Sequence, residues 1–403
     1  MSLLPVAQAQ ERLFGKAAPI QRAETVPLAD AAGRVLAEDL TARLTQPPFD
    51  ASAMDGYALR QEDAAEPGAI LKVIGVSAAG RAFGGRVAKG QAVRIFTGAP
   101  VPEGADSVLL QEDAEKLPNG EIRSTFPVRP GQHVRPRGQD FVEGEAVLAA
   151  GTVMDFTRLT VAAAMNHETL SVRRRPRVAI LATGDELVPP GRIPGPAQIV
   201  ASNTFGIAAL ARGAGADVLD LGIVPDDRAA ITAAVERAKA EDIDVLVTLG
   251  GASVGDHDLV QATLMAAGMV LDFWRIAMRP GKPLMVGSLG GMHVLGLPGN
   301  PVSSLVCGLL FLEPLVLKLA RLPPARREAT ALAATTLKAN DQRQDYLRAR
   351  LITSPDGDLL AEPFGKQDSS MMKIFANADC LIVRPPHAPE LTAGAPCLIL
   401  MLR

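Results

Sequence analysis

The chain has 403 residues, and at about 100–200 residues per domain it is expected to contain several domains. Hydrophobic residues make up 48% of it and charged residues 21%, which is enough apolar material to fold without disulfides or a structural metal. A net charge of −3 argues against a protein that binds nucleic acid or acidic membranes through its overall charge.

The cysteines, the N-terminal residues and the most apolar stretch indicate where in the cell the protein is expected. Cys307, Cys380 and Cys397 lie far apart and form no CxxC motif, so neither a disulfide framework nor a zinc site is expected. Residues 1–10 lack the basic and apolar regions of a signal peptide. Charged residues and a proline interrupt the apolar stretch 301–320, which predicts a buried helix and no membrane span. We therefore expect a cytoplasmic protein.

The first part of the chain changes character three times. Residues 8–23 can form a short amphipathic helix, and from about 24 to 150 short strands broken by Gly and Pro, as at 71–76, predict a β-rich region. Residues 156–165 again favour a helix. The basic run 173–177 that follows is interpreted as a solvated domain boundary.

Beyond this boundary, apolar runs alternate with helical patterns, which predicts a parallel β/α sheet domain. The expected strands are 178–182, 218–224, 244–249 and 293–297, and the expected helices are 203–211, 227–240 and 302–319. After Pro323-Pro324, short alternating strands predict a small β domain, either a barrel or a sandwich.

Three loops follow strands of the predicted sheet, at the edge where open parallel sheets bind ligands. In the first loop, 183–187, the adjacent carboxylates Asp185 and Glu186 suit a metal ion or proton transfer, although they could also cap a turn. The second loop, 250–258, is rich in glycine, and successive amides of such a loop can hold a phosphate. It matches neither the P-loop nor the GxGxxG pattern, and a glycine turn without a ligand stays possible.

Two further segments favour anions. The loop 297–304 leads from a strand into a helix whose N-terminus can hold an anion, but it could equally be a rigid corner. Arg275, Arg279 and Lys282 lie close together in a run stiffened by two prolines, which favours an anion site over a solvated turn. Together these loops predict a site for a phosphorylated ligand, a divalent cation and a second anion.

At these loops the chain resembles the MoeA-type molybdopterin molybdenumtransferases, the family that includes the E domain of gephyrin. The resemblance rests on seven runs in order: 47–58 (PPFDASAMDGYA), 94–102, 135–140, 183–187, 250–258, 279–283 and 297–304. It implies an elongated multidomain α/β and β protein with a central three-layer α/β domain similar to MoaB and Mog, a β-rich N-terminal region and a small C-terminal β-barrel.

The resemblance also implies four domains. Domain I combines 7–25, 43–53 and 143–174, domain II combines 26–42 and 54–142, domain III is 175–325 and domain IV is 326–403. The implied assembly is a homodimer whose active site is shared between subunits. Molybdopterin adenylyltransferase and proteins that mature molybdoenzymes are the other expected partners.

The implied activity is insertion of molybdenum from molybdate into adenylylated molybdopterin, with release of AMP and with Mg²⁺ as the divalent cation. A molybdopterin adenylyltransferase-like activity is the enzymatic alternative, but it would not need the N-terminal region or the C-terminal β domain. A non-catalytic dimeric scaffold of the gephyrin type is the other alternative, and it would not need the acidic and cationic loops.

Carried over position by position, the resemblance implies four sets of site residues. The catalytic set is Asp55, Thr97, Glu186, Asp226 and Asp258, and the metal set is Asp140, Asp185, Glu186 and Asp258. The pterin-nucleotide set is Gly250, Gly251, Ser253, Gly255, Asp256, Pro298, Gly299 and Asn300. The molybdate set is Arg275, Arg279, Lys282, Pro283 and Ser303, with Arg343 or Arg348 and Ser369 or Ser370 from the C-terminal domain. Arginine stands at 275 and 279 where the family commonly has lysine, which keeps the charge but replaces a point charge with a planar fork.

Overall fold

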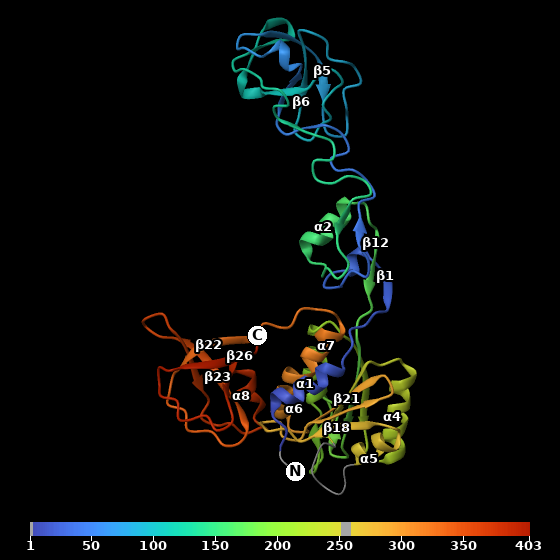
Figure 1. The fold of residues 1–403 in the computed structure, drawn as a ribbon, viewed down its shortest axis with the longest axis vertical. Coiled ribbons are helices and arrows are strands. Elements are labelled where there is room, and N and C mark those ends of the chain that lie inside the picture. Colours follow the sequence, from blue (N-terminus) through green and yellow to red (C-terminus); the bar gives the residue numbers. More distant parts are fainter. Residues whose placement is uncertain (1–2, 251–258) are drawn as a thin grey trace. The chain divides into compact units, whose positions relative to one another are not determined.

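The structure is a computed structural model that describes residues 3–250 and 259–403 (Figure 1). The chain forms two compact units. The first contains the residues up to 24 together with those from 173 onward, and the second contains residues 25–172. Each unit is described by itself, and the four domain boundaries given above stay a prediction.

A six-stranded sheet forms the centre of the first unit. Its order is β16 (Asp217–Val224), β13 (Arg177–Thr183), β17 (Val245–Leu249), β21 (Met292–Leu297), β20 (Met285–Leu289) and β18 (Val270–Trp274). The first four strands are parallel, but β20 and β18 are antiparallel to their neighbours. The prediction of a wholly parallel sheet is therefore wrong at this edge, where β20 and β21 form a hairpin that turns at Gly290-Gly291.

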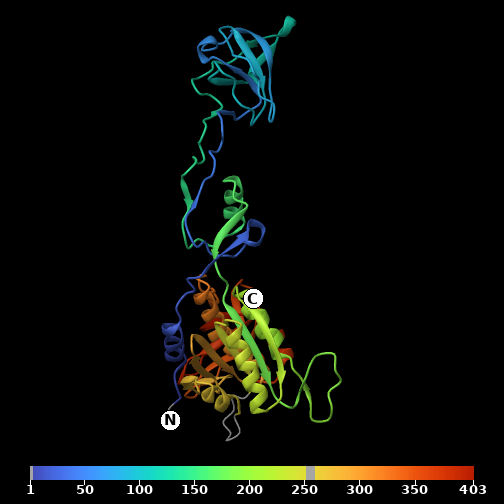
Figure 2. The same cartoon turned by 90° about the vertical axis from the view of Figure 1, so that its right-hand side faces the viewer.

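Both faces of this sheet are buried, as the continuous apolar run in β13 predicted. Val178 and Ile180 point into one hydrophobic cluster, whereas Ala179 and Leu181 point into another. The first cluster lies under α1 (Val6–Lys16), α3 (Asn203–Gly213), α6 (Pro301–Cys307) and α7 (Glu313–Leu319), and the second under α4 (Arg228–Ala240) and α5 (Leu259–Ala266). The predicted three-layer α/β architecture is confirmed (Figure 2).

The N-terminal helix is shorter than predicted. α1 ends at Lys16, because Ala17 is already extended, and the chain continues without helix to residue 22. The helix buries Val6, Ala9 and Leu13 in the first hydrophobic cluster of the sheet domain.

The apolar segment 301–319 is a buried helix, as predicted. It consists of α6, a π-helical turn (Gly308–Leu312) and α7. By length and composition alone this helix could cross a membrane, but 78% of its most apolar window is buried inside the protein. Packing in the core accounts for its apolar character.

The C-terminal segment forms a closed barrel, one of the two predicted architectures. Its five strands are β22 (Glu328–Ala333), β23 (Gln344–Thr353), β24 (Leu359–Pro363), β25 (Cys380–Arg384) and β26 (Pro396–Met401), and α8 (Met372–Ala376) lies between β24 and β25 in the chain. The ring closes because β23 pairs with both β24 and β25. A short strand of the preceding domain, β19 (Met278–Arg279), also pairs with β23 and extends the barrel sheet.

The second unit is rich in β structure, as predicted. Its main sheet has the order β7 (Ser107–Leu110), β4 (Gly56–Leu59), β6 (Gln91–Ile95), β5 (Ile70–Ser77), β9 (Glu121–Ser124) and β8 (Ala114–Lys116). Three strand pairs accompany it: β1 (Ala23–Pro27) with β12 (Thr169–Arg173), β2 (Leu40–Thr41) with β11 (Ala146–Leu148), and β3 (Ala51–Ser52) with β10 (Val134–Arg135). The helix α2 (Phe156–Ala164) confirms the helical pattern at 156–165.

Candidate functional site

The carboxyl ends of β13, β17 and β21 open into a cavity of about 810 Å³ in the first unit. Because these strands are parallel, their carboxyl ends, where the three loops begin, lie at one sheet edge. The cavity is lined by residues of all three loops, namely Thr183, Gly184, Glu186, Gly250, Pro298, Gly299, Asn300 and Pro301, and also by Asp226 and Pro283. The first and third loops and Gly250 of the second are therefore grouped as predicted, whereas the rest of the second loop, 251–258, lies outside the described residues.

Gly250 permits two of these loops to approach closely. Its φ is +96°, and a Cβ at this position would lie 2.7 Å from the carbonyl oxygen of Thr183. A side chain would therefore separate the ends of β13 and β17. Thr183 is itself buried, so this floor of the cavity is tightly packed.

Glu186 and Asp226 line the acidic end of the cavity, and Asp185 lies beside Asp226. Asp185 Oδ1 accepts a hydrogen bond of 3.1 Å from the backbone N–H of Asp226. Partial burial raises the pKa of Asp226, and the charges of Asp185 and Glu186 raise it further. A site that raises the pKa of a carboxyl group through like charges suits a cation, because a cation would stabilise the ionised form.

Part of the predicted acidic and glycine-rich site lies outside the described residues. This applies to Gly251, Ser253, Gly255, Asp256 and Asp258. Within residues 3–250 and 259–403, no group of three or more His, Cys, Asp or Glu side chains is arranged to hold a metal ion.

The loop 297–301 of the sheet domain contacts the barrel domain within the first unit. Asn300 Nδ2 donates a hydrogen bond of 3.1 Å to the hydroxyl of Ser369, and the N–H of Val302 donates to the carbonyl of the same residue at 3.1 Å. Ser370 and Met372 complete the cavity wall from the barrel side. Ser369 therefore holds the loop, whereas Ser370 faces the cavity.

The predicted cationic residues have different surroundings. Arg275 stacks on the ring of Trp274 with its guanidinium 4.1 Å from the ring centroid, and it adopts a positive φ of 78°. Lys282 is exposed and Pro283 lines the cavity, whereas Ser303 is buried in α6.

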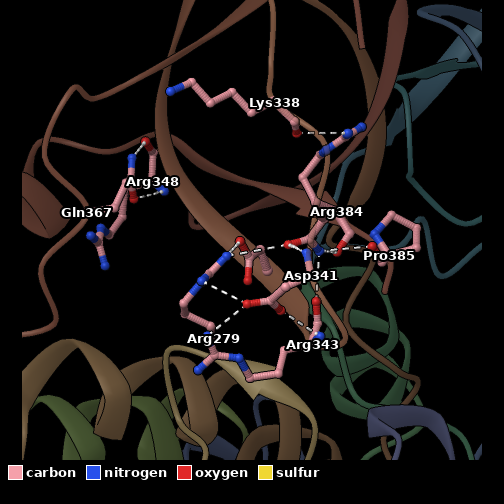
Figure 3. A network of polar contacts seen from close by, with 10 residues as sticks. Arg279, Lys338, Asp341, Arg343, Arg348, Gln367, Arg384 and Pro385 are labelled. Carbon is pink, nitrogen blue, oxygen red and sulfur yellow. Dashed lines mark hydrogen bonds and ion pairs between the residues drawn. The ribbon is translucent and has the colours of Figure 1, made fainter. Parts of the chain in front are cut away.

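Arg279 is held by acidic residues of the barrel domain (Figure 3). Its guanidinium forms an ion pair with Asp345 and donates a hydrogen bond of 3.2 Å to Asp341. The hydrogen bond to Asp345 is the main reason that the pKa of Arg279 is raised. Arg343 lies in the same network, since its Nη2 donates to Asp341 at 2.9 Å.

Arg348 is different, because its charge has no acceptor among the described residues. The residue is fully buried, and its Nε, Nη1 and Nη2 atoms form no hydrogen bond there. Its backbone is held by Gln367, which accepts from the N–H and donates to the carbonyl at 3.0 Å each (Figure 3). Burial lowers the pKa of this guanidinium. An unpaired buried guanidinium is a natural binding group for an anion.

The second unit brings Asp55 and Thr97 together at the ends of β4 and β6. Asp55 Oδ1 accepts hydrogen bonds of 2.8 Å from both the backbone N–H and the hydroxyl of Thr97. These bonds lower the pKa of Asp55. Asp140 is exposed and lines a separate hollow of about 480 Å³ with Gln139 and residues 46–49.

Sequence reasoning missed several residues of these sites. Asn203 lines the large cavity and donates a hydrogen bond of 2.7 Å to the carbonyl of Gly299. Arg94 lies near Asp55, stacks on Phe96 at 4.7 Å and donates to the carbonyl of Gly56. Asn203 could have been predicted from its place in the sequence, because it begins the helix that follows the first loop. No pattern marked Asp341 and Asp345, because their roles depend on pairing between β19 and β23.

Comparisons with known proteins cover almost the whole chain. Residues 4–166 match the MoeA N-terminal region (domain I and II), residues 179–318 a probable molybdopterin binding domain, and residues 330–402 the MoeA C-terminal region (domain IV). A molybdopterin molybdenumtransferase from Haemophilus influenzae is 34% identical over 397 residues, which cover 97% of both chains. The chain belongs to the MoeA family.

Other MoeA-family comparisons agree. A molybdopterin molybdenumtransferase from Bacillus subtilis is 34% identical over 388 residues, which cover 94% of this chain and 90% of that one. The crystal structure of a molybdopterin biosynthesis MoeA protein from Pyrococcus horikoshii superposes with a TM-score of 0.83 at 32% identity and covers 100% of both chains. The family resemblance inferred from the seven sequence runs is confirmed.

Proposed function

We propose that this MoeA-family protein inserts molybdenum from molybdate into adenylylated molybdopterin and releases AMP. The observation that carries the proposal is the large cavity, which combines a glycine-rich strand end, an acidic group and loops held against the barrel domain. A cavity of about 810 Å³ has the size of a site for a compact organic ligand. The glycine-rich strand end suits the phosphates of the nucleotide, and the cationic run suits the oxyanion.

Mg²⁺ is proposed as the divalent cation of the reaction. The described carboxylates do not form a complete metal site by themselves. Asp258, which lies outside the described residues, would complete a ligand set with Asp226, Asp185 and Glu186, because hard carboxylate oxygens are the ligands that Mg²⁺ prefers. When bound, the ion would neutralise charge that develops on the phosphates during cleavage of the phosphoanhydride. The contribution of the chain's own acidic residues would be to hold the ion, and the raised pKa of Asp226 fits a site that a cation completes.

The anion-binding residues would hold molybdate, and we include Arg279 and Arg343 among them, which both donate to Asp341 in this structure. Arg348 has an unpaired buried guanidinium, Lys282 is exposed, and Arg275 is fixed on Trp274. Ser370 lines the cavity wall, but its hydroxyl and its N–H both donate to Asp368, so it offers no free donor. The cationic groups provide donors without requiring any covalent chemistry from the protein, so their contribution is binding and orientation of the dianion.

We also propose a cytoplasmic homodimer whose active site is shared between subunits. In this assembly Asp55, Thr97 and Asp140 of one copy would serve the cavity of the other, as the family resemblance implies. The carboxylate of Asp55 is fixed at the ends of two strands by two hydrogen bonds from Thr97, which is consistent with such a role.

The function is tested by measuring AMP release from adenylylated molybdopterin with Mg²⁺, in the presence and absence of molybdate. We expect molybdate-dependent release of AMP and molybdenum in the pterin product. Binding of the nucleotide without AMP release, with molybdate and Mg²⁺ both present, would contradict the proposal and favour a carrier or scaffold.

A further inference from the structure

Asp341 occupies a position between two arginines of the barrel interface. Its Oδ2 accepts a hydrogen bond of 3.2 Å from Arg279 Nη1 and one of 2.9 Å from Arg343 Nη2 (Figure 3). One carboxylate oxygen therefore bridges two guanidinium groups. This is the arrangement in which arginines bind a free oxyanion.

The two guanidinium groups are accessible to solvent. The side chains of Arg279 and Asp341 are 46% and 42% exposed, and that of Arg343 is 27% exposed. Asp341 lies in the irregular segment between β22 and β23, outside the barrel strands. A ligand can therefore reach the arginines, and the carboxylate in front of them is not fixed by a strand.

Arg279 keeps other acceptors without Asp341. Asp345 lies on β23 with only 7% of its side chain exposed, and it forms an ion pair with Arg279 from the neighbouring strand β19. Asn340 Oδ1 accepts a further hydrogen bond of 3.4 Å from Arg279. Arg384 is the register partner of Asp345 on β25, so a third cation lies on the same part of the barrel. Removal of the exposed charge of Asp341 would leave this region positively charged, with Arg279 still held and Arg343 freed for a ligand.

We propose that Asp341 is a tethered competitor for the oxyanion substrate: its carboxylate fills an anion position between Arg279 and Arg343 and is displaced when a dianion binds. The inference rests on the proposed function, since it assigns a selectivity role within the molybdate site. Asp341 acts here as a specificity-determining residue and not as a catalytic one.

The competition favours dianions over monoanions. A tethered carboxylate has a high effective concentration beside the arginines, so a free monoanion of equal charge gains little by replacing it. A dianion interacts about twice as strongly with the same cations, because Coulomb energy scales with charge. A free anion must therefore displace the carboxylate before it can bind to the arginines. This requirement excludes abundant monoanions such as chloride.

The test is calorimetric titration of the full chain with molybdate, sulfate and formate, for the native protein and for Asp341→Asn. The amide keeps the size of the side chain and can still accept the hydrogen bond of 2.8 Å from the N–H of Arg343, but it lacks the charge. We expect molybdate and sulfate to bind about fivefold more tightly to Asp341→Asn. We also expect formate to bind this variant measurably and the native protein not measurably.

Asp356→Asn is the matched control, because it removes the same charge from an exposed turn at the far end of β23. It should leave all three affinities unchanged. Unchanged or weaker dianion binding by Asp341→Asn would overturn the inference, as would an absence of oxyanion binding by every protein tested. AMP release measured on the same samples separates the two proposals: tighter binding without AMP release would contradict the proposed function alone, and AMP release without tighter binding would contradict the inference alone.

Discussion

Asp226 links protonation to metal binding. Burial and two neighbouring carboxylates raise its pKa in the folded protein. A carboxyl group with a raised folded-state pKa contributes stability below its unfolded pKa, and this contribution is lost as the pH rises through the raised value. Ionisation of Asp226 therefore opposes folding, and a bound cation should reverse the effect.

We expect Mg²⁺ at pH 7 to raise the Tm of the native protein by about 2–4 °C, and to raise it less as the pH falls toward the raised pKa. In Asp226→Asn the shift should fall by about half or more, because one carboxylate ligand is missing. Differential scanning calorimetry with and without Mg²⁺ measures both. Asp217→Asn is the control, since Asp217 is exposed at the opposite end of β16; an equal Mg²⁺ shift in Asp226→Asn would contradict the metal assignment.

Arg348 should reduce the stability of the protein while serving its activity. A buried guanidinium without an acceptor costs free energy, so Arg348→Met should increase the free energy of unfolding by about 1–3 kcal/mol. The same variant should raise the KM for molybdate about tenfold or more. Urea unfolding and AMP release measure the two effects.

Arg350→Met provides the comparison on the same strand, because Arg350 forms an exposed ion pair with Glu362. Its loss should lower stability by about 1 kcal/mol or less and leave the KM unchanged. A less stable Arg348→Met protein would mean that the guanidinium has a partner within the protein. The sequence alone could indicate that Arg348 belongs to an anion site, but its burial without a partner depends on packing between segments far apart in the chain.

The close approach between the ends of β13 and β17 depends on Gly250. Gly250→Ala would add a Cβ 2.7 Å from the Thr183 carbonyl at a φ of +96°. Gly268 has a nearly identical φ of +97°, but a Cβ there would have its nearest contact at 3.9 Å. Both substitutions strain the backbone, and only the first also creates a clash.

We therefore expect Gly250→Ala to lower the free energy of unfolding by about 1–2 kcal/mol more than Gly268→Ala. It should also weaken binding of the nucleotide, because the end of β17 must move away from the cavity. Chemical denaturation and nucleotide titration of the two variants give the comparison. Equal losses of stability would mean that the contact with Thr183 relaxes without cost.

Elements with a simple hydrophobic pattern could be predicted from the sequence. The run at 178–182 is apolar on both faces, and β13 is buried on both faces. The strands β18 and β20 were missed because their direction is set by a hairpin and by pairing that no local pattern encodes. The helix predicted at 8–23 was too long, because Ile20 packs on the sheet domain from an extended segment and mimics helical spacing.

The same limit applies to the candidate site. The three loops could be grouped from the order of strands and loops, because parallel strands place their carboxyl ends together. The division of the cationic residues into a paired Arg279 and an unpaired Arg348 could not be predicted, since it depends on the barrel strands that pack beside them.

At the scale of the whole molecule, the two compact units should unfold separately. Leu59 is fully buried in the core of the second unit, and Leu315 is fully buried in that of the first. Replacing either by Ala should destabilise its own unit by about 2–5 kcal/mol and leave the transition of the other unit in place. Calorimetry should resolve two transitions, and a joint shift of both by one substitution would show that the units unfold as one.

The shared active site of the proposed dimer can be tested by complementation. Asp55→Ala and Lys282→Ala should each be inactive, because they remove groups from different parts of the same site. After the two variants are unfolded and refolded together, about a quarter of native activity should return, since half of the dimers are mixed and each contains one intact site. Activity that stays at the level of the separate variants would place both residues in the site of a single subunit.

The position of the strand β19 limits where this chain can be cut into separately folding fragments. Although β19 precedes the barrel domain in sequence, it covers the edge of β23 at Gln344 and Asp345, to which β24 does not pair. A barrel expressed from residue 326 onward would expose this edge and invite association with other strands. A peptide carrying residues 275–283 should bind such a fragment by β-augmentation, so the boundary seen in the sequence is not the boundary at which the folded chain can be cut cleanly.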